Sequence, residues 1–440
     1  MRPSPDAAVI DGGGGALIPG LHDHHIHLLA TAAAARSVVA GPPEVRDERA
    51  LAAALRRADA ALAPGAWIRA VGYHESVAGD IDRHDLDRLV PRRPVRVQHR
   101  SGARWVLNSV AVDSLGLDHQ DHHADRSGIE RDAAGRTTGR LHRADDWLRH
   151  LLPREDPPDL AALGRRLARF GVTAVTDTTP YTTFEDLAPL TDAVASGALP
   201  QHVVVTGGPE LAGSDPPAGL SWGPVKIVID DGAYPSLDDL CDRFTAAHRH
   251  GRRVAVHCVT RVALVLALAA WDEAGSRPGD RIEHGAVIPD DQYDRIARHG
   301  LTVVTQPGFV AERGDDHLRD VDPDDRPHLY PCASLIDRGI AVAGSTDAPY
   351  THLDPWRAVD AARTRTTATG ATVGAREAVG ARRALDLFLG SADAPGGPPR
   401  SVTAGSPADL CLLTVPLDDA LRNPREVRVA ATVVDGRIVR

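Results

Sequence analysis

A group of histidines and an aspartate near the start of the chain has the composition of a metal site. Residues 18–29 have the sequence IPGLHDHHIHLL. If this segment is extended, Asp23, His25 and His27 share one face, because side chains two positions apart point the same way from a strand. Neighbouring imidazoles suit a divalent metal, most often zinc. The alternative is a surface turn that happens to be rich in histidine.

Four more residues able to do chemistry stand in or just after predicted strands: Lys226, His257, His284 and Asp347. Lys226 lies in the apolar run PVKIVI, where a lysine is costly to bury unless it is paired or used; an edge lysine that reaches solvent is the alternative. Taken singly, each histidine could be a hydrogen-bonded core residue, and Asp347 could be a turn residue or helix N-cap. Together they favour a site at the C-terminal ends of parallel strands.

The elements that must position these residues alternate from residue 160 onward. We expect helices at 160–170, 184–196, 237–250, 261–274 and 292–299, and strands at 172–177, 202–206, 225–229, 254–257, 281–284, 301–306 and 340–345. Strands separated by helices predict a parallel sheet, and at least seven of them favour a closed (β/α)8 TIM-like barrel over an open doubly wound sheet. No glycine-rich dinucleotide fingerprint follows a strand.

The remaining segments predict one insertion and a small terminal module. Helices are expected at 30–40 and 48–62 and strands at 67–71 and 95–98, whereas periodicity is weak between about 100 and 157. We therefore predict a barrel over 18–400 with an insertion at about 72–157 that covers the site and carries an exposed loop at 117–123. The tail, 401–440, predicts antiparallel strands with a hairpin turn at Asp435-Gly436, joining residues 1–17 in a small β-sandwich-like module.

The composition limits the classes of partner that we expect for this protein. The 440 residues carry a formal net charge of −10 without a Lys/Arg-rich run, which argues against nucleic acid. The longest apolar stretch, 262–271, is too short to cross a bilayer, and residues 1–20 lack a signal-peptide pattern. The four cysteines form no CxxC pair and predict reduced thiols. We expect a cytoplasmic protein with a small-molecule substrate and no membrane partner, and leave homo-oligomerisation open.

The ordered set resembles the amidohydrolase superfamily of metal-dependent hydrolases, and within it the YtcJ-like branch that includes N-substituted formamide deformylase. The matching motifs cover nearly the whole chain: DHHIH (23–27), WVLNS (105–109), GIERD (128–132), VKI (225–227) with DG (231–232), His257, RIEH (281–284), GSTDAP (344–349), PADL (407–410) and VDG (434–436). The resemblance implies that His25, His27 and Asp347 hold one metal, that His257 and His284 hold a second, and that a carboxylated Lys226 bridges them.

The resemblance also implies a reaction. Asp347, Lys226 and His284 become catalytic candidates, with Asp347 as the base, and one or two divalent metals, most commonly zinc, would activate water. The implied reaction is hydrolysis of a C–N bond of the amide or N-formyl type. A deaminase, lactonase or ester hydrolase with the same ligands is the first alternative, because fold-level analogy does not separate these reactions. A non-catalytic metal- or ligand-binding barrel is the second.

The sequence departs from the family in three places. The lead-in before the first histidines is short, which indicates an abbreviated module or a start further upstream. The lysine strand is followed by an extra acidic residue, Asp230, and Ala103 stands where the branch would have a histidine. Substrate contacts are therefore carried over only as candidates: Tyr73, His99, Trp105, Asn108 and Arg313.

Overall fold

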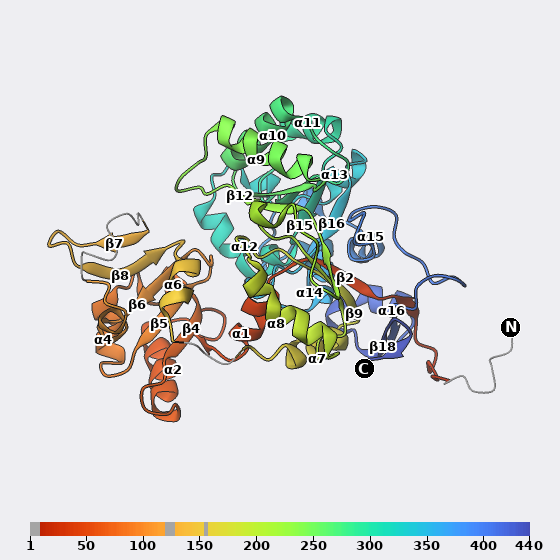
Figure 1. Cartoon of the computed structure of the whole chain (residues 1–440). Coiled ribbons are helices and arrows are strands. Elements are labelled where there is room, and N and C mark those ends of the chain that lie inside the picture. The colour runs from red at the N-terminus through yellow and green to blue at the C-terminus, as the bar shows by residue number, and fades with distance from the viewer. Residues whose placement is uncertain (1–8, 119–127, 154–156) are drawn as a thin grey trace. The chain divides into compact units, whose positions relative to one another are not determined.

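The computed structural model describes residues 9–118, 128–153 and 157–440 and shows a mixed α/β protein (Figure 1). Its chain divides into two compact units. Unit 1 comprises Met1–Thr31 and Asp159–Arg440, and unit 2 comprises Ala32–Pro158. Helix α1 (Leu28–Ala34) runs across the division.

Unit 1 is built on two parallel sheets. One has the order β11-β10-β9-β2 and the other the order β12-β13-β14-β15-β16. Their bounds are β2 (Leu21–Ile26), β9 (Val172–Asp177), β10 (His202–Val205), β11 (Leu220–Trp222), β12 (Val225–Val228), β13 (Val254–Cys258), β14 (Arg281–His284), β15 (Thr302–Thr305) and β16 (Val342–Gly344). All seven strands expected from residue 160 onward are confirmed, with ends that differ by no more than two residues.

Backbone hydrogen bonds also join residues of the two sheets at two places. Lys226 N–H donates to Gly207 O at 2.9 Å, which connects the chain after β10 to β12. Asp347 N–H donates to His25 O at 2.8 Å, which connects the loop after β16 to β2. This arrangement, with helices between successive parallel strands, fits a TIM-barrel-like fold.

Several helices of unit 1 begin at a residue whose side chain caps the first turn. Thr183, Ser236 and Thr260 accept backbone N–H groups at the starts of α8, α9 and α10. The core between α9 and α10 includes Phe244 and Trp271, whose ring centroids are 5.0 Å apart. The bounds of the unit 1 helices are α7 (Leu160–Arg169), α8 (Phe184–Ala195), α9 (Leu237–Arg249), α10 (Arg261–Ala274), α11 (Tyr293–Arg298), α12 (Gly308–Asp320), α13 (Ala333–Asp337), α14 (Pro355–Thr364), α15 (Ala381–Asp386) and α16 (Leu417–Arg422).

The terminal segments form a four-stranded antiparallel sheet. Its order is β1-β17-β18-β19, with bounds β1 (Leu17–Pro19), β17 (Leu410–Leu413), β18 (Val429–Val434) and β19 (Arg437–Ile438). Val434 pairs with Arg437 across Asp435-Gly436, so the expected hairpin turn is confirmed. A sandwich of two such sheets stays a prediction.

The side chain of His202 links β10 to this terminal sheet. Its Nε2 lies 3.2 Å from Asp409 Oδ1 and 3.5 Å from Asp435 Oδ1. The hydrogen bond with Asp409 raises the pKa of His202 above 6.5, although partial burial acts in the opposite direction. A histidine whose pKa rises on folding contributes stability fully below its unfolded pKa, and loses that contribution as pH rises through its folded pKa.

We therefore expect His202→Gln to lower the unfolding midpoint more at about pH 5.5 than at about pH 8.5. Chemical denaturation at the two pH values measures the difference. In an Asp409→Asn background the same substitution should show little pH dependence, because the main partner of the imidazolium is gone. Equal losses at both pH values in the wild-type background would contradict the assignment.

Unit 2 contains a six-stranded mixed sheet of order β3-β4-β5-β6-β8-β7 (Figure 1). Its strands are β3 (Val38–Val39), β4 (Ile68–Tyr73), β5 (Val95–His99), β6 (Arg104–Leu107), β7 (Ile129–Arg131) and β8 (Thr137–His142), and its helices are α2 (Glu48–Ala61), α3 (Glu75–Ala78), α4 (Arg83–Leu89), α5 (Ser109–Ser114) and α6 (Asp145–Leu151). Strands β3, β4 and β5 are parallel, whereas β5, β6, β8 and β7 pair antiparallel.

The helix expected over 30–40 is wrong beyond Ala34, where α1 ends. The β-branched residues Val38–Val39 form strand β3 instead, which pairs with β4. Most of the expected loop at 117–123 lies outside the described residues. Leu117, which is described, is fully buried rather than exposed.

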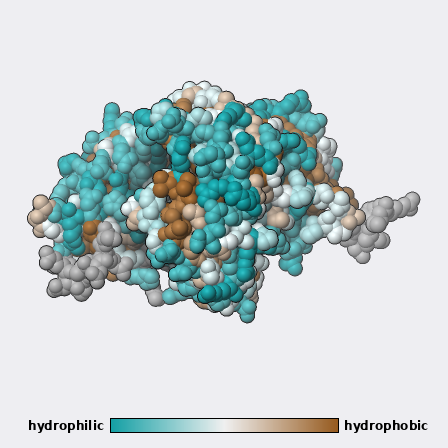
Figure 2. Space-filling model, turned by 90° about the horizontal axis from the view of Figure 1, so that it is seen from above, coloured by the Kyte–Doolittle hydropathy of each residue, from teal (hydrophilic) through white to brown (hydrophobic). Residues whose placement is uncertain are grey.

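Apolar residues fill the interior of both units, and hydrophilic residues dominate the face seen in Figure 2. Among the described residues, no helix has the length and hydropathy needed to cross a bilayer. All four cysteines are free thiols, as their spacing predicted.

Candidate metal centre

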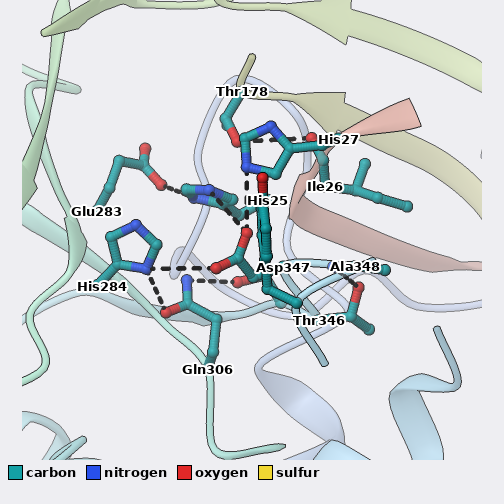
Figure 3. Close-up of polar contacts among 12 residues, drawn as sticks. His25, Ile26, His27, Thr178, Glu283, His284, Gln306, Thr346, Asp347 and Ala348 are labelled. Atoms are coloured by element: carbon teal, nitrogen blue, oxygen red, sulfur yellow. Dashed lines mark hydrogen bonds and ion pairs between the residues drawn. The ribbon is translucent and has the colours of Figure 1, made fainter. Parts of the chain in front are cut away.

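His25 and His27 lie at the end of β2, beside the loop that follows β16. Asp347 N–H donates to His25 O at 2.8 Å, and His27 N–H donates to Ala348 O at 3.0 Å. The side chains converge as a result: Asp347 Oδ1 is 3.2 Å from His27 Nε2 and 3.5 Å from His25 Nε2 (Figure 3). Two segments more than 300 residues apart in sequence therefore meet at one point.

His284 reaches the same point from β14. Its φ is 70° and that of Gly285 is 52°, so the strand ends in a left-handed turn. The ring centroid of His284 lies 4.7 Å from that of His25 and 4.5 Å from that of His257. Ligand atoms of His25, His284 and Asp347 all fall within 4.8 Å of one another. Asp347 also has a positive φ, 55°, and such strained backbone concentrates at functional sites.

Three of these imidazoles contact a neighbouring side-chain oxygen through Nδ1, and Nδ1 of His284 also lies 3.8 Å from Asp347 Oδ2. The contacts run from His25 Nδ1 to Glu283 Oε2, from His27 Nδ1 to Thr179 Oγ1 at 3.2 Å, and from His284 Nδ1 to Gln306 Oε1 at 2.8 Å. An oxygen that accepts the Nδ1 proton leaves the lone pair of Nε2 available to a metal. Gln306 is fixed in this sense, because its Nε2 donates to Val304 O and to Ser345 Oγ.

The buried polar atoms of the centre fit a bound cation. His25 Nε2, Lys226 Nζ and Asp347 Oδ1 are buried, and none has a hydrogen-bond partner within the part of the chain that the structure describes. A buried polar group without a partner costs about 1–3 kcal/mol, more if charged. Ligation relieves that cost for the imidazole and the carboxylate. The residues present therefore fit a divalent metal.

The charges of these groups also suit metal binding. Burial lowers the pKa of His25 and of His284, and nearby Lys226 lowers both further. Burial lowers the pKa of Lys226 itself. Burial raises the pKa of Asp347, but interactions with His25 and His27 outweigh it and hold that pKa below its usual range. Neutral imidazoles and an ionised carboxylate are the forms that bind metals.

Comparison with known proteins now decides the family. A model described as the amidohydrolase family matches residues 8–440, almost the entire chain. The chain belongs to the amidohydrolase family. It is therefore a hydrolase that acts on carbon–nitrogen bonds.

Two relatives resemble this amidohydrolase along most of their length. N-substituted formamide deformylase from Arthrobacter pascens is 27% identical, covering 98% of this chain and 90% of that protein. A putative amidohydrolase, YtcJ, from Bacillus subtilis is 24% identical, covering 82% of this chain and 75% of that protein.

Solved structures share the fold. An uncharacterised metal-dependent hydrolase from Pyrococcus furiosus has a TM-score of 0.62 at 23% identity, covering 86% of this chain and 82% of its own. Atrazine chlorohydrolase TrzN from Arthrobacter aurescens TC1, complexed with zinc, has a TM-score of 0.54 at 13% identity, covering 97% and 84% respectively.

Asp23 takes a different place from the one its spacing suggested. We expected it to project with His25 and His27, but its carboxylate accepts Thr346 N–H at 2.9 Å and the Thr346 hydroxyl. Asp23 therefore anchors the loop that carries Asp347 in this amidohydrolase. It does not belong to the group of possible metal ligands formed by His25, His284 and Asp347.

Glu283 was missed by the sequence reasoning, which gave a role only to His284 of the RIEH motif. Its side chain is fully buried. Oε2 accepts the Nδ1 proton of His25, and Oε1 forms an ion pair with Arg281 Nε at 2.5 Å. The sequence does contain a signal for Glu283. Arg281 and Glu283 carry opposite charges two residues apart, within a strand that is otherwise expected to be buried.

We expect Glu283→Gln to weaken metal binding by about 10–100-fold, because a neutral amide orients His25 but makes its imidazole less basic. Titration of the purified variant against a chelating competitor measures this. Glutamine is preferable to alanine, since alanine would leave Arg281 buried without its partner. Unchanged metal affinity would contradict the role of Glu283.

Three of the substrate candidates make internal hydrogen bonds in unit 2. The Tyr73 hydroxyl donates to Gly79 O at 2.6 Å, and Trp105 Nε1 donates to Asp145 Oδ1 at 2.7 Å. Asn108 caps α5 by accepting Ala111 N–H. These contacts give the three side chains structural tasks, and their role with substrate stays a prediction.

The other two candidates are His99 and Arg313. His99 Nε2 contacts Glu75 Oε2 at 3.1 Å within unit 2. Arg313, on α12 in unit 1, donates to Tyr350 O at 2.6 Å, and its guanidinium lies 4.6 Å from the ring centroid of Phe309. The Tyr350 ring in turn lies edge-on to that of His27, at 5.4 Å between centroids. Arg313 therefore stands one residue removed from the metal centre.

Proposed function

We propose that this amidohydrolase is a metal-dependent enzyme that cleaves an amide or N-formyl bond of a small molecule. The observation that carries the proposal is the buried cluster of His25, His284 and Asp347, whose ligand atoms lie within 4.8 Å of one another. The formamide deformylase that matches 98% of this chain supports the N-formyl class of substrate.

The proposed ligand assignment divides the centre in two. His25, His27 and Asp347 would hold one divalent metal of the zinc type, since nitrogen and carboxylate ligands suit that ion. His257 and His284 would hold a second. Burial lowers the pKa of Lys226, and a neutral amine can add carbon dioxide and release a proton to give a carbamate, an anionic group that would link the two metals.

A divalent metal at such a site supplies Lewis acidity and lowers the pKa of water. The side chains of the protein transfer the proton and hold the reacting groups in position. Asp347 is ionised and reaches the centre of the group, so it accepts the proton of the attacking water and returns it to the leaving nitrogen. His284 is held by Gln306 through Nδ1, and the same nitrogen lies 3.8 Å from Asp347 Oδ2, so its ring stands beside this carboxylate. Glu283 and Thr179 keep the remaining imidazoles in position.

We further propose that the two parallel sheets of unit 1 close into one (β/α)8 barrel, which the backbone hydrogen bonds between the two sheets support. In that fold the centre lies at the C-terminal ends of the strands, where TIM-barrel enzymes place their active sites. A cytoplasmic location agrees with the four free cysteines.

Metal analysis followed by product analysis tests the proposed function. Purified protein loaded with zinc is incubated with N-substituted formamides and with the matching acetamides. Release of amine together with formate or acetate supports the proposal. Ammonia released from an amino group would favour a deaminase, and a new carboxylate without amine would favour a lactonase or ester hydrolase. A chain that neither contains nor takes up metal would overturn the proposal.

A further inference from the structure

A second group of possible metal ligands lies entirely within unit 2. Strands β4 and β5 are parallel, and Tyr73 pairs with His99 at their C-terminal ends. His74 follows directly after β4, so the two histidines lie side by side, with ring centroids 5.9 Å apart. The next residue after His74 is Glu75, whose carboxylate faces both rings.

The same short motif, His-x-Ser, positions both imidazoles. His74 Nδ1 lies 2.9 Å from Ser76 Oγ, and His99 Nδ1 lies 2.7 Å from Ser101 Oγ. Each Nδ1 can therefore donate its proton to a serine hydroxyl, and the lone pair of Nε2 is then directed at Glu75. In the other tautomer, the backbone N–H of each serine donates to Nδ1 and Nε2–H faces Glu75 instead.

The spacing of the ligand atoms matches that of the candidate metal centre in unit 1. Glu75 Oε2 lies 3.1 Å from His99 Nε2 and 3.7 Å from His74 Nε2. The corresponding distances from Asp347 Oδ1 are 3.2 Å to His27 Nε2 and 3.5 Å to His25 Nε2. A metal about 2.0–2.1 Å from each ligand atom requires separations of this size.

We propose that His74, Glu75 and His99 bind a further divalent metal of the zinc type, separate from the metal centre of unit 1. Two imidazole nitrogens and one carboxylate oxygen are a ligand set that zinc accepts, with a further position left for water. Arg104 contacts the other oxygen of Glu75 and forms a second ion pair with Asp80 at 3.0 Å. Oε1 is thereby occupied, and Oε2 remains directed at the two histidines.

Zinc content per chain tests the proposal on the full-length protein. The His74→Ala/His99→Ala double variant should bind about one zinc ion fewer than its parent, both in the wild type and in a His25→Ala/His27→Ala background. The second background separates this site from the one in unit 1. Cobalt substitution gives an independent readout, because its visible absorption bands report each occupied site.

Matched controls keep the result interpretable. His142→Ala removes a histidine that also faces a carboxylate of unit 2, Glu130 at 3.4 Å, and should leave the zinc content unchanged. His99→Cys should retain the ion, since a thiolate binds zinc, whereas His99→Gln should lose it. If the double variant fails to fold, Glu75→Gln replaces it. Equal zinc content in parent and variants in both backgrounds would overturn the proposal, whether or not the enzyme hydrolyses amides.

Discussion

Asp347→Asn is expected to lower kcat by about a thousandfold while leaving the fold unchanged, because general acid–base catalysis contributes about 10²–10⁴-fold. Asparagine has the same shape, so the backbone bonds from Asp347 to His25 and from His27 to Ala348 survive. It cannot accept a proton from water, and it lacks the negative charge that now faces His25 and His27. Steady-state kinetics measure the loss of kcat, and metal analysis shows whether the variant has also lost its metal.

A matched carboxylate outside the centre provides the control. Asp272 pairs with Arg295 and His299 on the helical surface, and Asp272→Asn should leave kcat unchanged. If Asp347→Asn retains more than about a tenth of the activity with its metal bound, Asp347 is not the base. If it loses activity only because its metal is lost, excess metal should restore the rate, and the role of Asp347 is then ligation alone.

Lys226→Met is expected to remove most of the bound metal and the activity without destabilising the metal-free protein. The wild-type side chain is buried, and its Nζ has no hydrogen-bond partner among the described residues. Methionine has a similar length and fills the same space, and it removes the cost of about 1–3 kcal/mol for an unsatisfied buried polar group. The free energy of unfolding after chelation should therefore equal or exceed that of the wild type.

The combination of outcomes distinguishes function from structure at Lys226. Loss of metal with unchanged or higher stability means that the lysine is kept for ligation. Addition of acetate to Lys226→Ala tests the bridging role directly, because a small carboxylate can occupy the space left by the side chain. A variant that keeps its metal, or one destabilised by more than about 2 kcal/mol after chelation, would contradict the assignment.

The sequence alone determined most of the local structure. The strand at residues 172–177 was predicted with the bounds that β9 has, because an apolar, β-branched run between helical patterns leaves few alternatives. The strand at 281–284 also has the predicted bounds, those of β14. The Asp435-Gly436 turn was also predicted from neighbouring residues alone. The helix expected over 30–40 ended early, because pairing of Val38–Val39 with β4 depends on a strand that lies far along the chain.

The candidate metal centre, too, was predicted only in part from the sequence. Residue types and motif order were enough to name His25, His27, Lys226, His257, His284 and Asp347 as one set. Only the tertiary structure could show which nitrogen of each ring points inward, since Nδ1 of His25 is held by a residue 258 positions away. The same is true of Glu283, whose importance arises from that contact, and of His74 and His99, which the parallel register of β4 and β5 brings together. The sequence determines which chemical groups are present, whereas the pairing of the strands determines which of these groups form hydrogen bonds with one another.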